Sequence, residues 1–84
     1  MEMIKRRAQK KTTPSFAVEF EREADGRWIA EIPKLPGVMA YGSTKQIAQR
    51  RVYAVALRTL ADSVEEGSTP ASVSRLFTYA VAGR

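Results

Sequence analysis

Residues 25–44 read DGRWIAEIPKLPGVMAYGST, and turn-forming residues divide this segment into short extended pieces. Asp25-Gly26 is typical of a tight hairpin turn. The segment 33–37 predicts a second reversal, because its prolines cannot donate to a strand ladder and its glycine tolerates a positive φ. Gly-Ser-Thr at 42–44 ends the next strand and offers hydroxyls that cap a helix. The segment therefore predicts a strand, a tight turn, a strand and the start of a helix.

Alternation of apolar with small or acidic residues extends this pattern to both sides of the Asp-Gly turn. Residues 16–22 predict a first strand, residues 28–32 a second and residues 38–41 a short third. One face of the first two strands is apolar and the other is largely acidic. The row expected to face the core comprises Phe16, Val18, Phe20, Trp28, Ala30 and Ile32.

Residues 45–66 contain neither glycine nor proline and predict a helix of about six turns. Two capping arrangements fit its start. Ser43 has Gln46 at the capping-box spacing, whereas Thr44 would have Ile47 at that position. The apolar stripe expected to face the sheet comprises Val52, Tyr53, Ala56, Leu57, Leu60 and Val64.

Gly67 is well placed to cap the end of the helix, and Pro70 prevents its continuation. Residues 72–81 then alternate again and predict a fourth strand. A strand that follows three antiparallel strands and a helix returns parallel to the first strand through a right-handed crossover. The predicted fold class is α+β in the order β-β-β-α-β, with three antiparallel strands, a fourth strand parallel to the first, and one long helix on one face.

Length and composition limit the functions open to this chain. With 84 residues, 44% of them hydrophobic, it forms one domain with a modest core, so we expect a homo-oligomer and favour a dimer. The absence of cysteine and histidine excludes disulfides, thiolate nucleophiles, thiol or imidazole metal sites and the usual neutral-pH proton shuttle. No apolar stretch reaches the roughly 18 residues of a membrane span, and no apolar signal core follows the basic start. We expect a soluble, cytoplasmic protein.

The net charge of +5 is concentrated near the start of the chain. Residues 1–14 lack apolar periodicity and are predicted to be a flexible basic arm, followed by a single domain at residues 15–84. Five cations within seven positions would attract phosphate in a salt-dependent manner, although a solvated tail is the favoured interpretation. A small nucleic-acid-binding module that uses this arm is the alternative function. The candidate nucleic-acid-binding residues are Lys5, Arg6, Arg7, Lys10 and Lys11.

The spaced set of turn and cap motifs resembles the HicB-like antitoxins of bacterial and archaeal toxin–antitoxin pairs. The matching elements are the strand 16–21, Asp25-Gly26, the strand end and Pro-x-Leu-Pro-Gly at 32–37, Gly-Ser-Thr in 41–44, and Ala48 in the first helical turn. The resemblance covers roughly residues 15–66. It implies a partial ribonuclease-H-like fold and a noncatalytic protein, without cofactor, that binds and silences a small HicA-type toxin that cleaves mRNA.

Two departures from the family pattern bear on its partners. Ile47 stands where the family often has an acidic residue ahead of the helix alanine. No room is expected after the fourth strand for the helix-turn-helix or ribbon-helix-helix segment that many members append. DNA is therefore a less favoured partner than the toxin.

Glu19, Glu21 and Glu31 are expected on the open face of the sheet. A solvated polar face is the favoured interpretation, a partner-facing acidic patch is the second, and a metal site is the weakest because neither the helix start nor the fourth strand supplies another acid. Since an RNA-cleaving toxin presents a basic surface, these glutamates are the candidate toxin-binding residues. Burial is favoured for Trp28 over stacking on nucleic acid, and Tyr41 is left open between the two.

Overall fold

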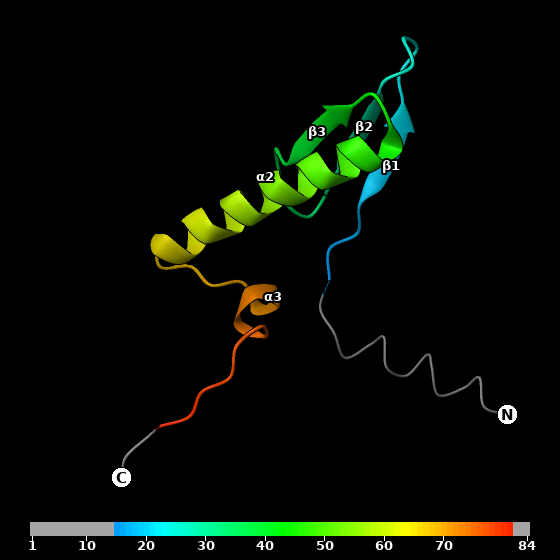
Figure 1. The fold of residues 1–84 in the computed structure, drawn as a ribbon. Coiled ribbons are helices and arrows are strands. Elements are labelled where there is room, and N and C mark those ends of the chain that lie inside the picture. The colour runs from blue at the N-terminus through cyan, green and yellow to red at the C-terminus, as the bar shows by residue number, and fades with distance from the viewer. Residues whose placement is uncertain (1–14, 82–84) are drawn as a thin grey trace, which may run out of the picture.

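The computed structural model describes residues 15–81 and shows a small α+β fold (Figure 1). Three strands form an antiparallel sheet in the order β1-β2-β3, and one long helix crosses one face of it. These parts of the predicted fold are confirmed. The elements are β1 (Glu19–Arg22), β2 (Trp28–Glu31), β3 (Met39–Gly42), α2 (Lys45–Glu65) and α3 (Ala71–Ser74).

Two tight turns join the strands where the sequence places its glycines and prolines. In the first turn Gly26 adopts a φ of 93°, and its N–H donates to the Glu23 carbonyl at 2.9 Å. In the second turn Gly37 adopts a φ of 83°. The N–H of Ile32 donates to the Val38 carbonyl at 3.1 Å, which continues the β2–β3 ladder past the strand ends. Both turns follow the chemistry expected for a left-handed glycine.

The core lies between the sheet and α2 and consists mainly of small residues. Its buried members are Ala30, Ile32, Val38, Ala48, Val52 and Ala56. Phe16, Val18, Phe20 and Trp28 pack against this cluster while remaining partly exposed. The predicted apolar row of the first two strands therefore does face the helix, with its larger members around the rim of the core.

Local hydrogen bonds fix both ends of α2. The Thr44 hydroxyl accepts from the Ile47 N–H at 3.1 Å, so Thr44 rather than Ser43 is the N-cap. At the other end Gly67 has a φ of 98°, and its N–H donates to the Val64 carbonyl at 3.0 Å. The next N–H, of Ser68, reaches back to the Ser63 carbonyl at 2.8 Å, which completes a Schellman motif. The helix ends one residue earlier than predicted.

The first turn of α2 lies directly against the end of β3. A Cβ atom built on Gly42 would clash with the backbone nitrogen of Ala48 and would lie 2.9 Å from the carbonyl carbon of Ile47. Both obstacles are backbone atoms, which a side-chain rotation cannot move. Gly42 thus permits the close contact between strand and helix.

Gly42→Ala should lower the free energy of unfolding by about 1–3 kcal/mol, because α2 must shift away from the sheet to admit one methyl group. Urea unfolding followed by circular dichroism measures this change. Ser43→Ala, at the adjacent exposed position, is the control and should leave the unfolding midpoint within about 0.5 kcal/mol of the parent. Equal stability of both variants would contradict the close packing at Gly42.

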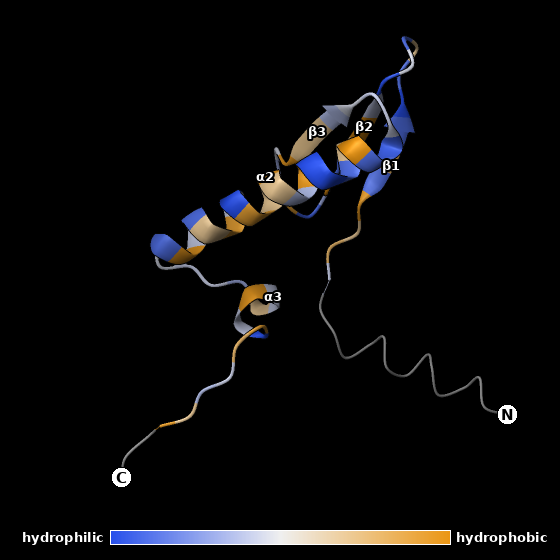
Figure 2. Ribbon diagram, viewed as in Figure 1, coloured by the Kyte–Doolittle hydropathy of each residue, from blue (hydrophilic) through white to orange (hydrophobic). Residues whose placement is uncertain are grey.

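The apolar stripe predicted for the helix is only partly correct. Val52 and Ala56 are buried, as expected, but Leu57 is 63% exposed and Val64 39% exposed. The physical reason is length. A helix of 21 residues spans about 31 Å, whereas a four-residue strand spans about 13 Å. The second half of α2 therefore extends beyond the sheet (Figures 1 and 2).

No fourth strand is present among the described residues, so the predicted strand over residues 72–81 is not confirmed. Ala71–Ser74 instead form the short helix α3, whose first turn is closed by the Pro70 carbonyl accepting from the Val73 and Ser74 N–H groups at 2.9 and 3.0 Å. Val73 and Phe77 lie at helical as well as strand spacing, Leu76 joins them only at helical spacing, and the local turn forms without a partner strand. Residues 77–81 continue without regular structure.

Candidate protein-binding face

No other described element covers the face of the sheet opposite α2 (Figure 1). Strand register places two cross-strand rows on it. One row runs from Glu21 on β1 through Ile29 on β2 to Tyr41 on β3, and the other runs from Glu19 through Glu31 to Met39. We call these six residues the open face. Its β1 side is acidic and its β3 side is apolar.

The three glutamates of the open face have no compensating cation within residues 15–81. Glu19 is directly opposite Glu31 in the β1–β2 pair, whereas Glu21 is opposite Ile29. Within residues 15–81 no ion pair or hydrogen bond engages the carboxylates of these glutamates. Like charges directly opposite across a strand pair are destabilising, so we expect Glu19 and Glu31 to repel each other in the free protein.

The β3 side of the open face offers apolar surface. Met39 and Tyr41 are 41% and 40% exposed, and half-buried Ile29 separates them from the acidic strand. The Arg27 guanidinium lies 4.6 Å from the centre of the Tyr41 ring, which holds the phenol in a cation–π contact. The Arg51 side chain, on α2, donates to the backbone carbonyl of Tyr41 at 3.0 Å. Tyr41 is thus positioned from both sides.

The hairpin turn beside this face is held by a short ion pair. The Asp25 carboxylate accepts from the backbone N–H of Arg27 at 3.0 Å and from its Nε at 2.9 Å. The backbone N–H of Arg27 is the main reason that the pKa of Asp25 lies below its usual value, and its side chain adds to the effect. Asp25 and the Arg27 side chain therefore act on the turn and on Tyr41 rather than on the glutamates.

The structure describes one of the two sets of predicted site residues and not the other. Glu19, Glu21 and Glu31 share the open face, and their role in binding stays a prediction. The candidate nucleic-acid-binding residues Lys5, Arg6, Arg7, Lys10 and Lys11 lie outside the described part of the chain. Met39 and the contact of Arg27 with Tyr41 were not anticipated. The alternation in residues 38–41 would have indicated Met39, because it places Val38 and Ala40 toward the core.

Trp28 lies in the row that faces α2 and is half-buried, which agrees with the burial favoured from the sequence. The Lys45 ammonium lies 5.8 Å from the centre of its ring and 4.9 Å from that of Phe20. The Arg22 guanidinium lies 5.4 Å from the Trp28 ring as well. These cations cover the rim of the core, so this tryptophan is not part of the open face.

Three comparisons with known proteins bear on identity, and the structure bears on metal binding and membrane spans. No family model matches this chain, and searches of the curated proteins and of the solved structures find no match. In the described residues, no three His, Cys, Asp or Glu side chains form a group that could hold a metal ion. No helix within residues 15–81 has the length and apolarity needed to cross a membrane.

Glu31→Gln should raise the free energy of unfolding by about 0.2–1 kcal/mol, because it removes the charge opposite Glu19. Urea unfolding at low ionic strength measures the gain. Glu21→Gln is the matched control, since Glu21 faces Ile29, and it should produce a smaller change. If the two variants shift the unfolding midpoint equally, the Glu19–Glu31 opposition does not destabilise the free protein.

Proposed function

We propose that this chain is a noncatalytic antitoxin of the HicB-like kind, which binds a small HicA-type mRNA-cleaving toxin in the cytoplasm. The open face is the proposed binding surface, with Glu19, Glu21 and Glu31 as the charged contacts. The observation that carries the proposal is the combination of three carboxylates, unpaired within residues 15–81, with exposed apolar surface on the sheet face opposite α2.

Charge complementarity explains how such a face would silence a ribonuclease. A toxin that cleaves mRNA must offer cations to the phosphate backbone, and an acidic strand competes for the same cations. A partner cation between Glu19 and Glu31 would also relieve the repulsion present in the free protein. Ile29, Met39 and Tyr41 would add apolar contact area, which charged pairs alone do not supply. Occupation of the RNA-binding surface is then enough to block cleavage.

The proposed family membership includes a finer fold than the three strands and helix described above. A partial ribonuclease-H-like fold has a fourth strand parallel to the first, beside β1. The order of β1, β2, β3 and α2 agrees with the first four elements of that fold. The outer edge of β1 is the place at which the fourth strand would add.

The test is a calorimetric titration with the protein encoded by the adjacent reading frame, which the proposal expects to be a HicA-type toxin, combined with co-purification and rescue of growth. Simultaneous Glu19→Gln, Glu21→Gln and Glu31→Gln substitution should raise the dissociation constant at least about tenfold. The effect should diminish at high salt, since screening weakens the attraction in the parent as well.

The matched control for this titration replaces three acids at the far end of α2. Asp62→Asn, Glu65→Gln and Glu66→Gln remove the same number of charges from exposed positions away from the open face. This control should bind the toxin like the parent. Equal affinity of the parent and the open-face variant would refute the proposed surface, and failure of the toxin to bind the parent would refute the function.

A nucleic-acid-binding module is the alternative function, and it depends on the basic residues of the arm. If it holds, binding of a labelled RNA or DNA oligonucleotide should weaken steeply with salt. Deletion of residues 1–12 should then abolish that binding while leaving toxin binding intact. Fluorescence anisotropy at several salt concentrations measures both the affinity and its salt slope. A salt slope unchanged by the deletion would exclude the arm as the binding element.

A further inference from the structure

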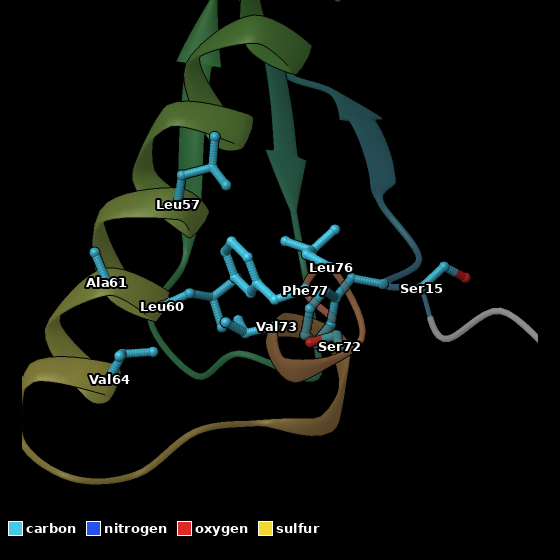
Figure 3. Close-up of a pocket in the computed structure, with 10 residues that line it drawn as sticks. Ser15, Leu57, Leu60, Ala61, Val64, Ser72, Val73, Leu76 and Phe77 are labelled. Atoms are coloured by element: carbon cyan, nitrogen blue, oxygen red, sulfur yellow. The ribbon is translucent and has the colours of Figure 1, made fainter. Parts of the chain in front are cut away.

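An apolar groove of about 370 Å³ lies beneath the half of α2 that extends beyond the sheet (Figure 3). Leu57, Leu60 and Val64 form one side, and α3 lies across from them with Val73. Phe16, in the segment leading into β1, also lines it. A second hollow of about 260 Å³ shares Phe16, Leu57 and Leu60 and extends over the core to Ile32. Apolar surface thus continues from α3 along the lead into β1.

Residues 77–81 bring further apolar side chains that their own chain does not bury. The Phe77 side chain points into the groove (Figure 3). Tyr79 and Val81, at the two following alternate positions, are 92% and 98% exposed. The chain runs away from its own sheet at this point (Figure 1). Residues 78–81 therefore have the length and alternation of a strand, and within residues 15–81 they pair with nothing.

The two edges of the sheet differ in how they are covered. β2 is central, so β1 and β3 each present one unpaired edge in the described part of the chain. On β3 the Tyr41 carbonyl already accepts from Arg51. The edge of β1, with its apolar lead through Phe16 and Val18, adjoins the hollow. An uncovered strand edge beside apolar surface is a site at which another strand adds.

We propose that this chain forms a twofold dimer in which residues 78–81 of each copy add as a strand to the β1 edge of the other. Tyr79 and Val81 of the donor would fill the hollow lined by Val18, Ile32 and Leu57 of the acceptor. The other two donated residues, Thr78 and Ala80, would face the same side as the open face. The proposal concerns a different surface from the toxin-binding one and does not depend on it.

Three observations favour a second copy as the occupant of the hollow. Each chain carries both the donor segment and the acceptor edge. A reciprocal exchange between two copies therefore fills both acceptor edges and uses both donor segments. The segment that follows α3 runs away from its own sheet (Figure 1). The core of the described residues holds six buried apolar residues, three of them alanines, so additional apolar burial would stabilise so small a fold.

Light scattering coupled to gel filtration gives the first test, with the parent expected at twice the chain mass. Tyr79→Arg should raise the dimer dissociation constant at least about tenfold, because it removes an aromatic anchor. Ala80→Arg is the matched control at the neighbouring position, which faces the opposite side of the proposed strand, and it should remain dimeric. Circular dichroism checks folding of both variants. A monomeric parent, or equal weakening by both substitutions, would overturn the proposal.

Cysteine cross-linking identifies the chain that supplies the strand, and the natural absence of cysteine keeps the background clean. One variant carries Ala17→Cys and a second carries Ala80→Cys. The two variants are mixed, unfolded, refolded together and oxidised. Adjacent strands lie about 4.8 Å apart, within reach of a disulfide. The expected product is a disulfide-linked dimer of the two variants. Thr78→Cys in place of Ala80→Cys should also form it, whereas Tyr79→Cys, on the opposite side of the proposed strand, should form it poorly. A disulfide that forms only within one chain carrying both substitutions would show instead that the chain supplies its own fourth strand.

Discussion

The close contact between α2 and the sheet is the constraint on which the rest of the structure depends. Gly42 lacks the atom that would collide with the backbone at Ala48, and Ala30, Ala48 and Ala56 form much of the buried layer. Small residues let the helix axis approach the strands, so the core is thin and the larger apolar side chains are moved to its rim. The helix packs over β3 and β2 on one face of the sheet, and the other face is left to water or a partner.

The strands are much shorter than the helix that packs on them. Only the first half of α2 has strands beneath it, so Leu57 and Val64 extend the apolar stripe past the point where the sheet ends. Helices gain most of their stability from tertiary packing of the apolar face. The Schellman motif at Gly67 nevertheless terminates α2 cleanly, which shows that the overhang is a defined element of the fold. Its unburied side therefore requires a physical explanation, which an added strand would supply.

Local chemistry explains which parts of the structure the sequence could predict. Gly26, Gly37 and Thr44 act through their own backbone or side-chain groups, so their turns and cap were readable from single residues. The assignment of Glu19, Glu21 and Glu31 to one face followed from alternation alone. The extent of the helix stripe in contact with the sheet depends on strand length, which alternation does not fix. The predicted fourth strand is not confirmed for a related reason, because a strand needs a partner edge whereas the turn at Pro70 forms locally.

The open face places two glutamates directly opposite each other on β1 and β2. A sheet face selected only for solubility gains nothing from placing Glu31 opposite Glu19, because alternating charges would solvate equally well at lower cost. Within residues 15–81, Arg27 is engaged with Asp25 and Tyr41. Violations of local rules that lack an internal compensation concentrate at functional sites. The same argument does not extend to Trp28, whose ring contacts the core and is covered by cations from its own chain. In the proposed function, the acidic strand beside an apolar strip is the part of this surface that a basic protein partner would contact.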